Sequence, residues 1–159
     1  MLLSKSYFNQ TAWFTAAGSG NVELIKKLWD WAKELQLKPE ELRNEVFLSK
    51  DIYNETAWHK AAERGDVEVL NKLLDWAKEL QLKPEELGNE VLWSKDKYKE
   101  TAFHWAAKRG HVEVLNKLWD LAVELHLKPE ELGNEVFLSK DKSKETACTR
   151  QKKEATLNC

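Results

Sequence analysis

A repeat of 45 residues runs through the chain and constrains its fold more than any other feature. The dipeptide Thr-Ala recurs at constant spacing, beginning at Thr11, Thr56, Thr101 and Thr146. Residues 56–100 and 101–145 are identical at 34 of 45 positions, and the string LKPEEL has the same offset in three copies. Because a single unit of this kind cannot bury its apolar face alone, we expect the copies to stack into a solenoid with one continuous core.

The repeat divides the chain into three whole copies and a partial copy at each end. We predict that residues 1–10 are the tail of a preceding copy, and the whole copies are residues 11–55, 56–100 and 101–145. Residues 146–159 begin a fourth copy and then depart from the pattern after Ala147. If one guanine is restored in the codon of Cys148, the rest can be read as W-H-x-A-[K/E]-[K/E]-R-G-H-V-E-L. We therefore predict a frameshifted fourth copy, and thus a fragment of a longer array or a gene interrupted by one base; the coding DNA tests this.

Each copy reads as three helices, as the second copy illustrates. Thr56 is a suitable N-cap for the first helix, and Gly65 can end it in the left-handed conformation. Asp66 caps a second helix, whose apolar residues recur every three or four positions. A third helix begins at Pro84, a favoured first position, and ends near residues 91–93. Since no strand pattern occurs in the sequence, the predicted fold class is all-α, an α-solenoid of three stacked repeats.

Composition argues against several kinds of partner and location. The net charge is −2, with 25 basic and 27 acidic residues interspersed, whereas nucleic-acid and anionic-membrane binding favour a basic patch. No apolar run approaches the roughly 18 residues that a membrane span requires. The two cysteines, Cys148 and Cys159, both lie in the last twelve residues, so no disulfide framework is expected. We therefore expect an intracellular, most simply cytoplasmic, protein that binds neither nucleic acid nor membrane.

The sequence also gives no sign of catalysis, a cofactor or a metal site. It contains no glycine-rich phosphate loop, nucleophile elbow or zinc signature. His59 and His104 occupy one repeat position, but Phe14 stands there in the first copy, which an essential chemical group would not permit. Paired carboxylates recur at predicted helix N-termini, where the helix dipole explains them: Glu40 and Glu41, Glu85 and Glu86, Glu130 and Glu131. We therefore predict that the protein is not an enzyme.

The segment from Asp96 to Leu115, which contains TAFHWAAKRGHVEVL, resembles the ankyrin signature D-x-x-G-x-T-P-L-H-x-A-A-x-x-G-H-x-E-V-V. This resemblance covers roughly half of each copy and recurs three times. Alanine replaces the family's proline at Ala102, an aromatic side chain replaces its leucine at Phe103, and Lys99 replaces its hairpin glycine. Because lysine resists a positive φ, the last change argues against a tight hairpin tip.

The period of the repeat also differs from that of the family. It exceeds the usual ankyrin length by about 12 residues, and the excess follows the second helix. The resemblance therefore implies an enlarged, three-helix ankyrin unit. The alternative is a solenoid of the armadillo or HEAT kind, whose period is about 40–47 residues.

The resemblance to ankyrin repeats implies that the chain binds another protein. Members of the family bind their partners with the hairpin tips and with the concave face of the first helix. Transferred by position, the candidate contacts are Ile52, Tyr53, Lys60, Lys97, Tyr98, Lys99 and Trp105, together with Thr15, Asn54, Lys142, Ser143 and Lys144. The family also implies that His59 and His104 steady a turn through hydrogen bonds.

Tyr53, Tyr98 and Trp105 are of types enriched at interface hot spots. Exposure of these three side chains favours a binding module. Burial of all three favours the alternative function, an architectural spacer of a longer array or a truncated product without a partner.

Two further expectations concern apolar surface. The positions of Trp29 and Trp31 in the first copy are occupied by Leu74 and Trp76 in the second copy and by Trp119 and Leu121 in the third. Side chains two residues apart point to different faces of a helix, so one of the two positions should be only partly buried. A stack without polar capping repeats should also expose apolar ends and self-associate through them.

Overall fold

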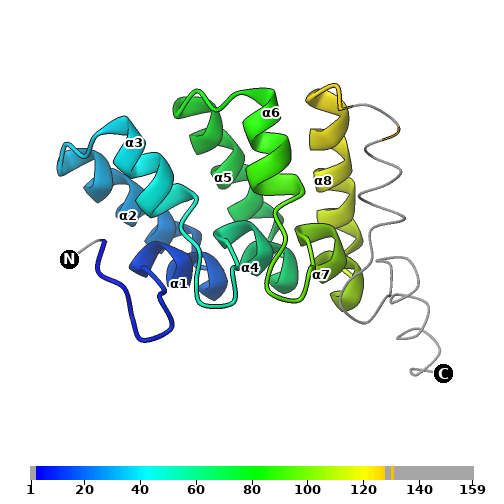
Figure 1. Ribbon diagram of the computed structural model, residues 1–159, viewed down its shortest axis with the longest axis horizontal. Coiled ribbons are helices and arrows are strands. Elements are labelled where there is room, and N and C mark those ends of the chain that lie inside the picture. Colours follow the sequence, from blue (N-terminus) through cyan, green and yellow to red (C-terminus); the bar gives the residue numbers. More distant parts are fainter. Residues whose placement is uncertain (1–2, 128–129, 131–159) are drawn as a thin grey trace.

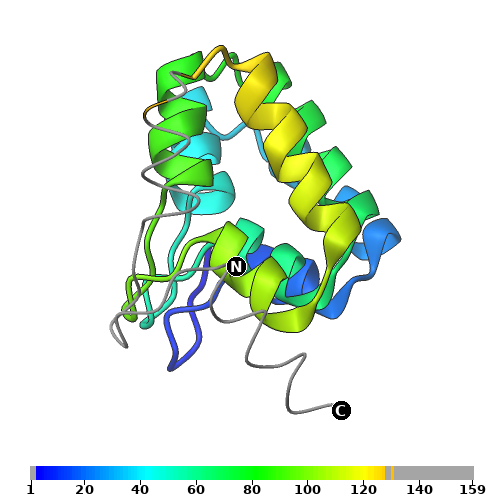
Figure 2. The same cartoon turned by 90° about the vertical axis from the view of Figure 1, so that its right-hand side faces the viewer.

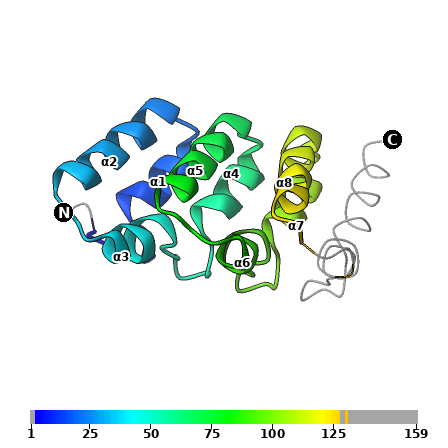
Figure 3. The same cartoon turned by 90° about the horizontal axis from the view of Figure 1, so that it is seen from above.

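A computed structural model describes residues 3–127 and residue 130, and within these residues every regular element is a helix. The copies follow one another along the long axis of the molecule (Figures 1 and 3). The first helices of the copies are α1 (Ala12–Ser19), α4 (Ala57–Arg64) and α7 (Ala102–Arg109). The second helices are α2 (Val22–Glu34), α5 (Val67–Glu79) and α8 (Val112–Glu124). The third segments are α3 (Pro39–Glu41) with η1 (Leu42–Phe47), and α6 (Pro84–Leu87) with η2 (Gly88–Leu92).

Seen along the stack, the three kinds of helix form three columns around a shared interior (Figure 2). α1, α4 and α7 pack against one another in one column, α2, α5 and α8 form the second, and the third segments form the last. The prediction of an all-α fold of stacked repeats is confirmed for the described residues. No helix among them is both long and apolar enough to cross a membrane. The predicted end of the third copy, the fourth copy and both cysteines lie outside the described residues.

The predicted helix boundaries of the second copy are confirmed. The Thr56 hydroxyl and the His59 side chain cap the start of α4 reciprocally, and Gly65 ends it with φ 82°. Asp66 then caps α5, its carboxylate accepting a hydrogen bond from the Val69 N–H at 3.0 Å. These boundaries follow from local side-chain chemistry, which is why the sequence alone locates them.

The third segment begins at Pro84, as predicted, but it continues as a π-helix rather than an α-helix. The Trp93 N–H donates to the Gly88 carbonyl, five residues earlier, at 2.9 Å. A π-helix has this i→i+5 bonding, and here it allows the adjacent residues Val91 and Leu92 both to be completely buried. The π form was not predicted from the sequence, because it depends on packing against α7 and α8.

A cluster of three indole rings fills the interface between the first two copies. We call the interface between two successive copies a joint. The rings of Trp13, Trp29 and Trp76 have centroids 5.0–5.4 Å apart, and the Trp29 and Trp76 rings stack at 27°. Trp29 is 1% exposed, whereas Trp31 is 46% exposed. The prediction that one site of this pair is partly exposed is confirmed in the first copy. It also holds in the third, where Trp119 is exposed and Leu121 buried, but not in the second, where both residues are buried.

Candidate functional site

Hairpin turns connect successive copies and project from one edge of the stack, at the bottom of Figure 1. In the hairpin that connects the second copy to the third, the Asp96 N–H donates to the Glu100 carbonyl at 2.9 Å and the Lys99 N–H to the Asp96 carbonyl at 3.0 Å. Lys99 has φ 63° and Asn54, at the equivalent position, has φ 61°. The tight hairpin tip therefore forms with lysine in the left-handed conformation. The expectation that lysine would argue against it was wrong.

The Asp96 carboxylate explains why lysine is tolerated there. Its Oδ1 accepts hydrogen bonds from the backbone N–H groups of Tyr98 at 2.7 Å and Glu100 at 2.8 Å. In the hairpin between the first and second copies, Asp51 Oδ1 likewise accepts hydrogen bonds from the backbone N–H groups of Tyr53 and Glu55. Such aspartate-centred turns fix the backbone, and two charge-assisted bonds can offset the roughly 1–2 kcal/mol that a left-handed residue costs. Burial raises the pKa of Asp96 above its ordinary value.

Successive hairpins are joined to one another by hydrogen bonds. The Lys97 N–H donates to the Tyr53 carbonyl at 2.7 Å, and the Asn54 side-chain amide donates to the Lys95 carbonyl at 2.7 Å. The preceding pair of hairpins repeats both bonds, from Ile52 N–H to the Phe8 carbonyl and from the Asn9 amide to the Lys50 carbonyl. The row of tips is therefore one connected surface rather than a set of independent loops.

An aromatic and basic cluster lies on these tips. The Lys97 Nζ lies 5.2 Å from the centroid of the Tyr53 ring and 5.8 Å from that of Tyr98. These distances are within the range of cation–π attraction, which holds the ammonium group beside two ring faces. Tyr98 is 44% exposed and Tyr53 is half-buried.

A second cluster of the same kind lies on α7. Lys108 Nζ is 4.5 Å and Lys60 Nζ 5.8 Å from the centroid of the half-buried Trp105 ring. The Trp105 indole N–H donates to Asp96 Oδ2 at 3.1 Å. Because the other oxygen of this carboxylate holds the Tyr98 backbone, one aspartate connects the tip cluster to the helix cluster. We call the resulting patch of Tyr53, Lys97, Tyr98, Trp105 and Lys108 the aromatic–lysine surface.

Lys60 has a different environment from the exposed lysines. Its Nζ forms ion pairs with Glu55 at 2.9 Å and Glu63 at 3.1 Å, and its side chain is 23% exposed. Burial would lower the pKa of Lys60, but the two carboxylates outweigh burial and raise it. Glu63 also binds Arg109 at 2.8 Å. The Lys60 charge is therefore largely neutralised within the protein.

The buried histidines connect neighbouring segments. His59 is completely buried; its Nδ1 accepts from the Thr56 N–H at 3.1 Å, which leaves Nε2 to donate to the Ser94 carbonyl at 3.0 Å. Burial lowers the pKa of His59 from 6.5 to about 4, so the ring is neutral at pH 7. His104 repeats the bond to the cap, accepting from the Thr101 N–H. This geometry agrees with the expected structural role. Among the described residues, no group of three or more His, Cys, Asp or Glu is placed to hold a metal ion.

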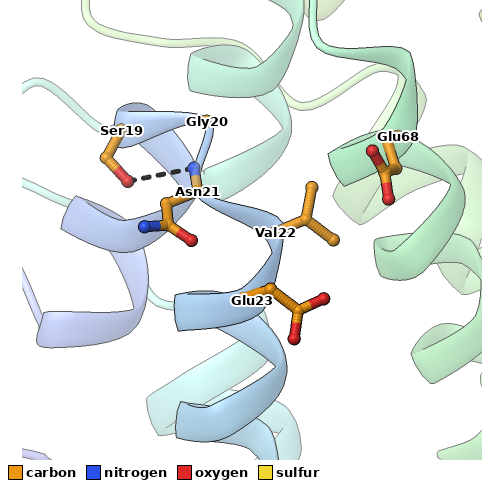
Figure 4. A pocket seen from close by; sticks show the side chains of 6 residues that line it. All are labelled: Ser19, Gly20, Asn21, Val22, Glu23 and Glu68. Carbon is orange, nitrogen blue, oxygen red and sulfur yellow. Dashed lines mark hydrogen bonds between the residues drawn. The ribbon is translucent and has the colours of Figure 1, made fainter.

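Two open hollows lie on the surface formed by the described residues of the stack. The larger, about 520 Å³, lies at the start of α2 and is lined by Ser19, Gly20, Asn21, Val22, Glu23 and Glu68 (Figure 4). Several of its polar groups serve the helix start, where Ser19 Oγ accepts from the Asn21 N–H at 3.2 Å, or form the surface ion pair of Glu23 with Lys26. The smaller, about 290 Å³, is lined by Gly18, Lys60, Glu63, Arg64 and Arg109. Neither hollow resembles an enclosed ligand pocket.

Residues 41–129, more than half of the chain, match the family described as ankyrin repeats (3 copies). The chain belongs to the ankyrin repeat family. This match favours the ankyrin assignment over the armadillo or HEAT alternative. A comparison with curated proteins gives no match. Ankyrin repeat domains are typically protein-binding modules and typically non-catalytic.

The structure of this ankyrin repeat protein brings most of the predicted contact residues together along one edge. Tyr53, Lys97 and Tyr98 meet at the tips, and Lys60 meets Trp105 on the first helices. Ile52, Asn54, Lys99 and Thr15 are exposed along the same hairpins and α1, whereas Lys142, Ser143 and Lys144 lie outside the described residues. Because Tyr98 is exposed and Tyr53 and Trp105 are half-buried, the burial of all three that would favour a spacer is not observed.

Sequence reasoning missed Lys108, whose ammonium group lies closest to the Trp105 ring. A signal was present in the sequence. Lys108 follows Trp105 by three residues on one helix, so their side chains share a face.

Proposed function

We propose that this chain is a non-catalytic scaffold that binds another protein through the aromatic–lysine surface. The observation that carries the proposal is the double role of the Asp96 carboxylate, which holds the Tyr98 backbone with one oxygen and the Trp105 ring with the other. The Trp105 ring, which is held in this way, loses little conformational entropy on binding, and the fixed backbone of Tyr98 limits the loss there, which favours affinity. Tyrosine and tryptophan are also among the residues that dominate binding energy at interfaces.

The charge of this edge supports an acidic partner segment. The carboxylates at the base of the hairpins face inward and are buried: Asp51, Glu55, Asp96 and Glu100. The lysines of the hairpin between the second and third copies are exposed instead: Lys95, Lys97 and Lys99. A surface that buries its carboxylates and exposes its ammonium groups is complementary to a negative partner, even though the whole chain has a net charge of −2.

We also propose that the repeat is an ankyrin unit enlarged by a third helical segment. The support is the position of α3 with η1 and of α6 with η2, each between a second helix and the next hairpin. The additional column lies on the hairpin side of the stack (Figure 2). On the first helices, Lys60 of α4 and Trp105 of α7 remain half-buried.

The proposal can be tested without knowing the natural partner. Peptides are selected from a random display library on the wild-type chain, and their affinities for purified variants are measured by calorimetry. We expect the selected peptides to be rich in Asp and Glu and to lose about tenfold or more in affinity for Lys97→Ala/Tyr98→Ala, the size of loss seen at hot spots. Binding should also weaken as salt is raised.

The matched control is Lys27→Ala, which removes an exposed lysine from α2, away from the hairpins. This variant should bind the peptides like the wild type. Circular dichroism establishes that each variant is folded. Equal affinity for the wild type and for Lys97→Ala/Tyr98→Ala would contradict the proposed surface.

A further inference from the structure

The smaller of the two hollows, about 290 Å³, lies between successive first helices of the stack. It is lined by Gly18 of α1, by Lys60, Glu63 and Arg64 of α4, and by Arg109 of α7. Three of these five residues are cations, although the whole chain has a net charge of −2. The chemistry of the hollow therefore depends on which of the three cations already has a carboxylate partner within the chain.

Two of the three cations are paired. Lys60 Nζ lies 2.9 Å from Glu55 Oε2 and 3.1 Å from Glu63 Oε2. Arg109 binds the other oxygen of Glu63, Oε1, at 2.8 Å. Burial would raise the pKa of Glu63, but hydrogen bonds from Arg109 and Lys60 outweigh burial and lower it. Glu63 is therefore ionised, and both of its oxygens are occupied.

Arg64, the third cation, has a different environment. Its side chain is exposed, and its guanidinium group forms neither a hydrogen bond nor an ion pair with any residue that the structure describes. The repeat explains this difference. Arg109 is the equivalent of Arg64 in the third copy, and it binds Glu63 of the copy before it, but the equivalent of Glu63 in the first copy is Gly18. At the first joint a glycine therefore stands where the second joint has a carboxylate.

The hollow continues the aromatic–lysine surface. Lys60 connects the two, because it lines the hollow and its Nζ also lies 5.8 Å from the centroid of the Trp105 ring. Its ion pairs with Glu55 and Glu63 hold it between them. A partner segment that extends from Trp105 towards α1 therefore passes over the hollow and over Arg64.

We propose that Arg64 binds one carboxylate side chain, Asp or Glu, of the partner segment, in the place that Glu63 holds at the second joint. A guanidinium group suits this ligand, since it can donate two parallel hydrogen bonds to the two oxygens of a carboxylate. The proposal rests on the proposed function in that it requires a bound acidic segment. It does not require the contacts of Lys97 and Tyr98 at the hairpin tips.

The charges around the hollow favour a carboxylate over a phosphate group. Glu63 lines the hollow, and the Asp66 carboxylate lies against Gly20, as the Arg64 side chain does. A phosphate group carries roughly −1.5 to −2 charges at pH 7, so these two carboxylates repel it more strongly than they repel a ligand with one charge. One carboxylate balances the single charge of Arg64.

The peptides selected on the wild-type chain test the proposal. Their acidic residues are replaced one at a time, Asp by Asn and Glu by Gln, and each peptide is titrated by calorimetry into the wild type and into Arg64→Gln. At one acidic position the replacement should lower the affinity for the wild type by about fivefold, the upper range for an exposed ion pair, and leave the affinity for Arg64→Gln unchanged. Lys27→Gln, which removes an exposed charge on α2, should show the losses of the wild type.

If no acidic position depends on Arg64 in this way, the proposal is wrong. The class of ligand is tested by placing phosphoserine at the position that does depend on it. This peptide should bind the wild type more weakly than the original peptide does. Tighter binding would overturn the assignment to a carboxylate and identify the hollow as a phosphate site.

The chain also offers a variant that fills the site from within. Gly18→Glu copies Glu63, and a Cβ at Gly18 would lie 3.7 Å from Lys60 Cβ, an ordinary contact, so the side chain fits. The new carboxylate should pair with Arg64 and lower peptide affinity about as much as Arg64→Gln does. Gly18→Ala is the matched control, since it adds the Cβ without the charge, and should bind like the wild type. A folded Gly18→Glu variant with the affinity of the wild type would exclude the hollow as the site.

Failure of the Arg64 site and failure of the hairpin surface give different results. If Lys97→Ala/Tyr98→Ala binds like the wild type while one acidic position still depends on Arg64, the hairpin surface is excluded and the Arg64 site is supported. If Lys97→Ala/Tyr98→Ala loses affinity while no position depends on Arg64, the Arg64 site is excluded and the hairpin surface is supported.

Discussion

The indole ring of Trp29 on α2 stacks on that of Trp76 on α5, with centroids 5.1 Å apart and planes inclined by 27°. The two residues belong to successive copies, so the pair is part of a joint. One repeat later the same two positions are Leu74 and Leu121, both buried. Two joints of one architecture are therefore filled by different side chains, and their stabilities can be compared by exchanging residues that the chain already uses.

We expect Trp29→Leu and Trp76→Leu each to lower the free energy of unfolding by about 1–3 kcal/mol, since each leaves space in a packed aromatic cluster. The double variant should lose less than the sum of the two losses, by about 0.5–1.5 kcal/mol, because the ring–ring contact is counted in both single variants. Urea unfolding followed by far-ultraviolet circular dichroism measures these values. Strictly additive losses would show that the stacked rings are not energetically coupled.

Acid should destabilise the protein in part through His59. The pKa of this residue is about 4 in the folded protein and 6.5 when unfolded, so the unfolded chain binds more protons between these values. Stability from this group is therefore complete above pH 6.5 and falls as the pH drops towards 4, by up to about 3 kcal/mol.

His59→Phe, which copies Phe14 at the equivalent position, isolates this contribution. At pH 7 the variant should be less stable by about 1–3 kcal/mol, because the Thr56 N–H and the Ser94 carbonyl lose their partner. Between pH 7 and pH 5 it should lose less stability than the wild type. Carboxylates also titrate in acid, but they are common to both proteins, so an equal loss in the two would exclude His59 as the source.

Two equivalent glycines should respond differently to alanine. Gly65 and Gly110 both end a first helix with a positive φ, 82° and 73°, so alanine is strained at either by about 1–2 kcal/mol. A Cβ at Gly65 would lie 2.5 Å from the His111 ring, whereas a Cβ at Gly110 meets no heavy atom within 4 Å in the described structure. Gly65→Ala should therefore be the more destabilising in thermal unfolding. Adding His111→Ala should reduce the difference, and an unchanged gap would contradict the steric explanation.

Lys99→Gly should stabilise the hairpin between the second and third copies, because glycine accepts φ 63° without the strain of a side chain. We expect a gain of up to about 1 kcal/mol after the greater backbone entropy of glycine in the unfolded chain is included. Lys97→Gly is the matched control: this position has no positive φ, so the variant should lose stability together with its contacts to two tyrosine rings. The melting temperatures of the two variants should move in opposite directions.

The sequence alone was sufficient to predict those structural features that depend on residues close to one another in the chain. Thr56, Gly65 and Asp66 end or begin helices through their own side chains or backbone freedom, and the structure places them as predicted. The turn at Lys99 was predicted wrongly, because the rule for positive φ considers one residue, whereas the Asp96 carboxylate supplies the compensating bonds.

The candidate site shows a different limit. The repeat identifies positions 60 and 105 as equivalents, but it does not state that Lys60 reaches the Trp105 ring of the next copy. That contact depends on the distance and angle between successive first helices, and on Glu55 and Glu63, which hold the lysine in place. The sequence could therefore indicate which residues gather along the edge of the stack, but not which of their charges are neutralised there.

The uneven distribution of indole rings makes the two joints spectroscopically distinct. At the first joint Trp13, Trp29 and Trp76 lie close enough for their excited states to couple, which should give an intense near-ultraviolet circular dichroism band. At the second joint the positions equivalent to Trp29 and Trp76 are leucines. Loss of this band therefore reports on separation of the first two copies alone, so that the chain carries a natural optical label for unfolding that begins at its N-terminal end.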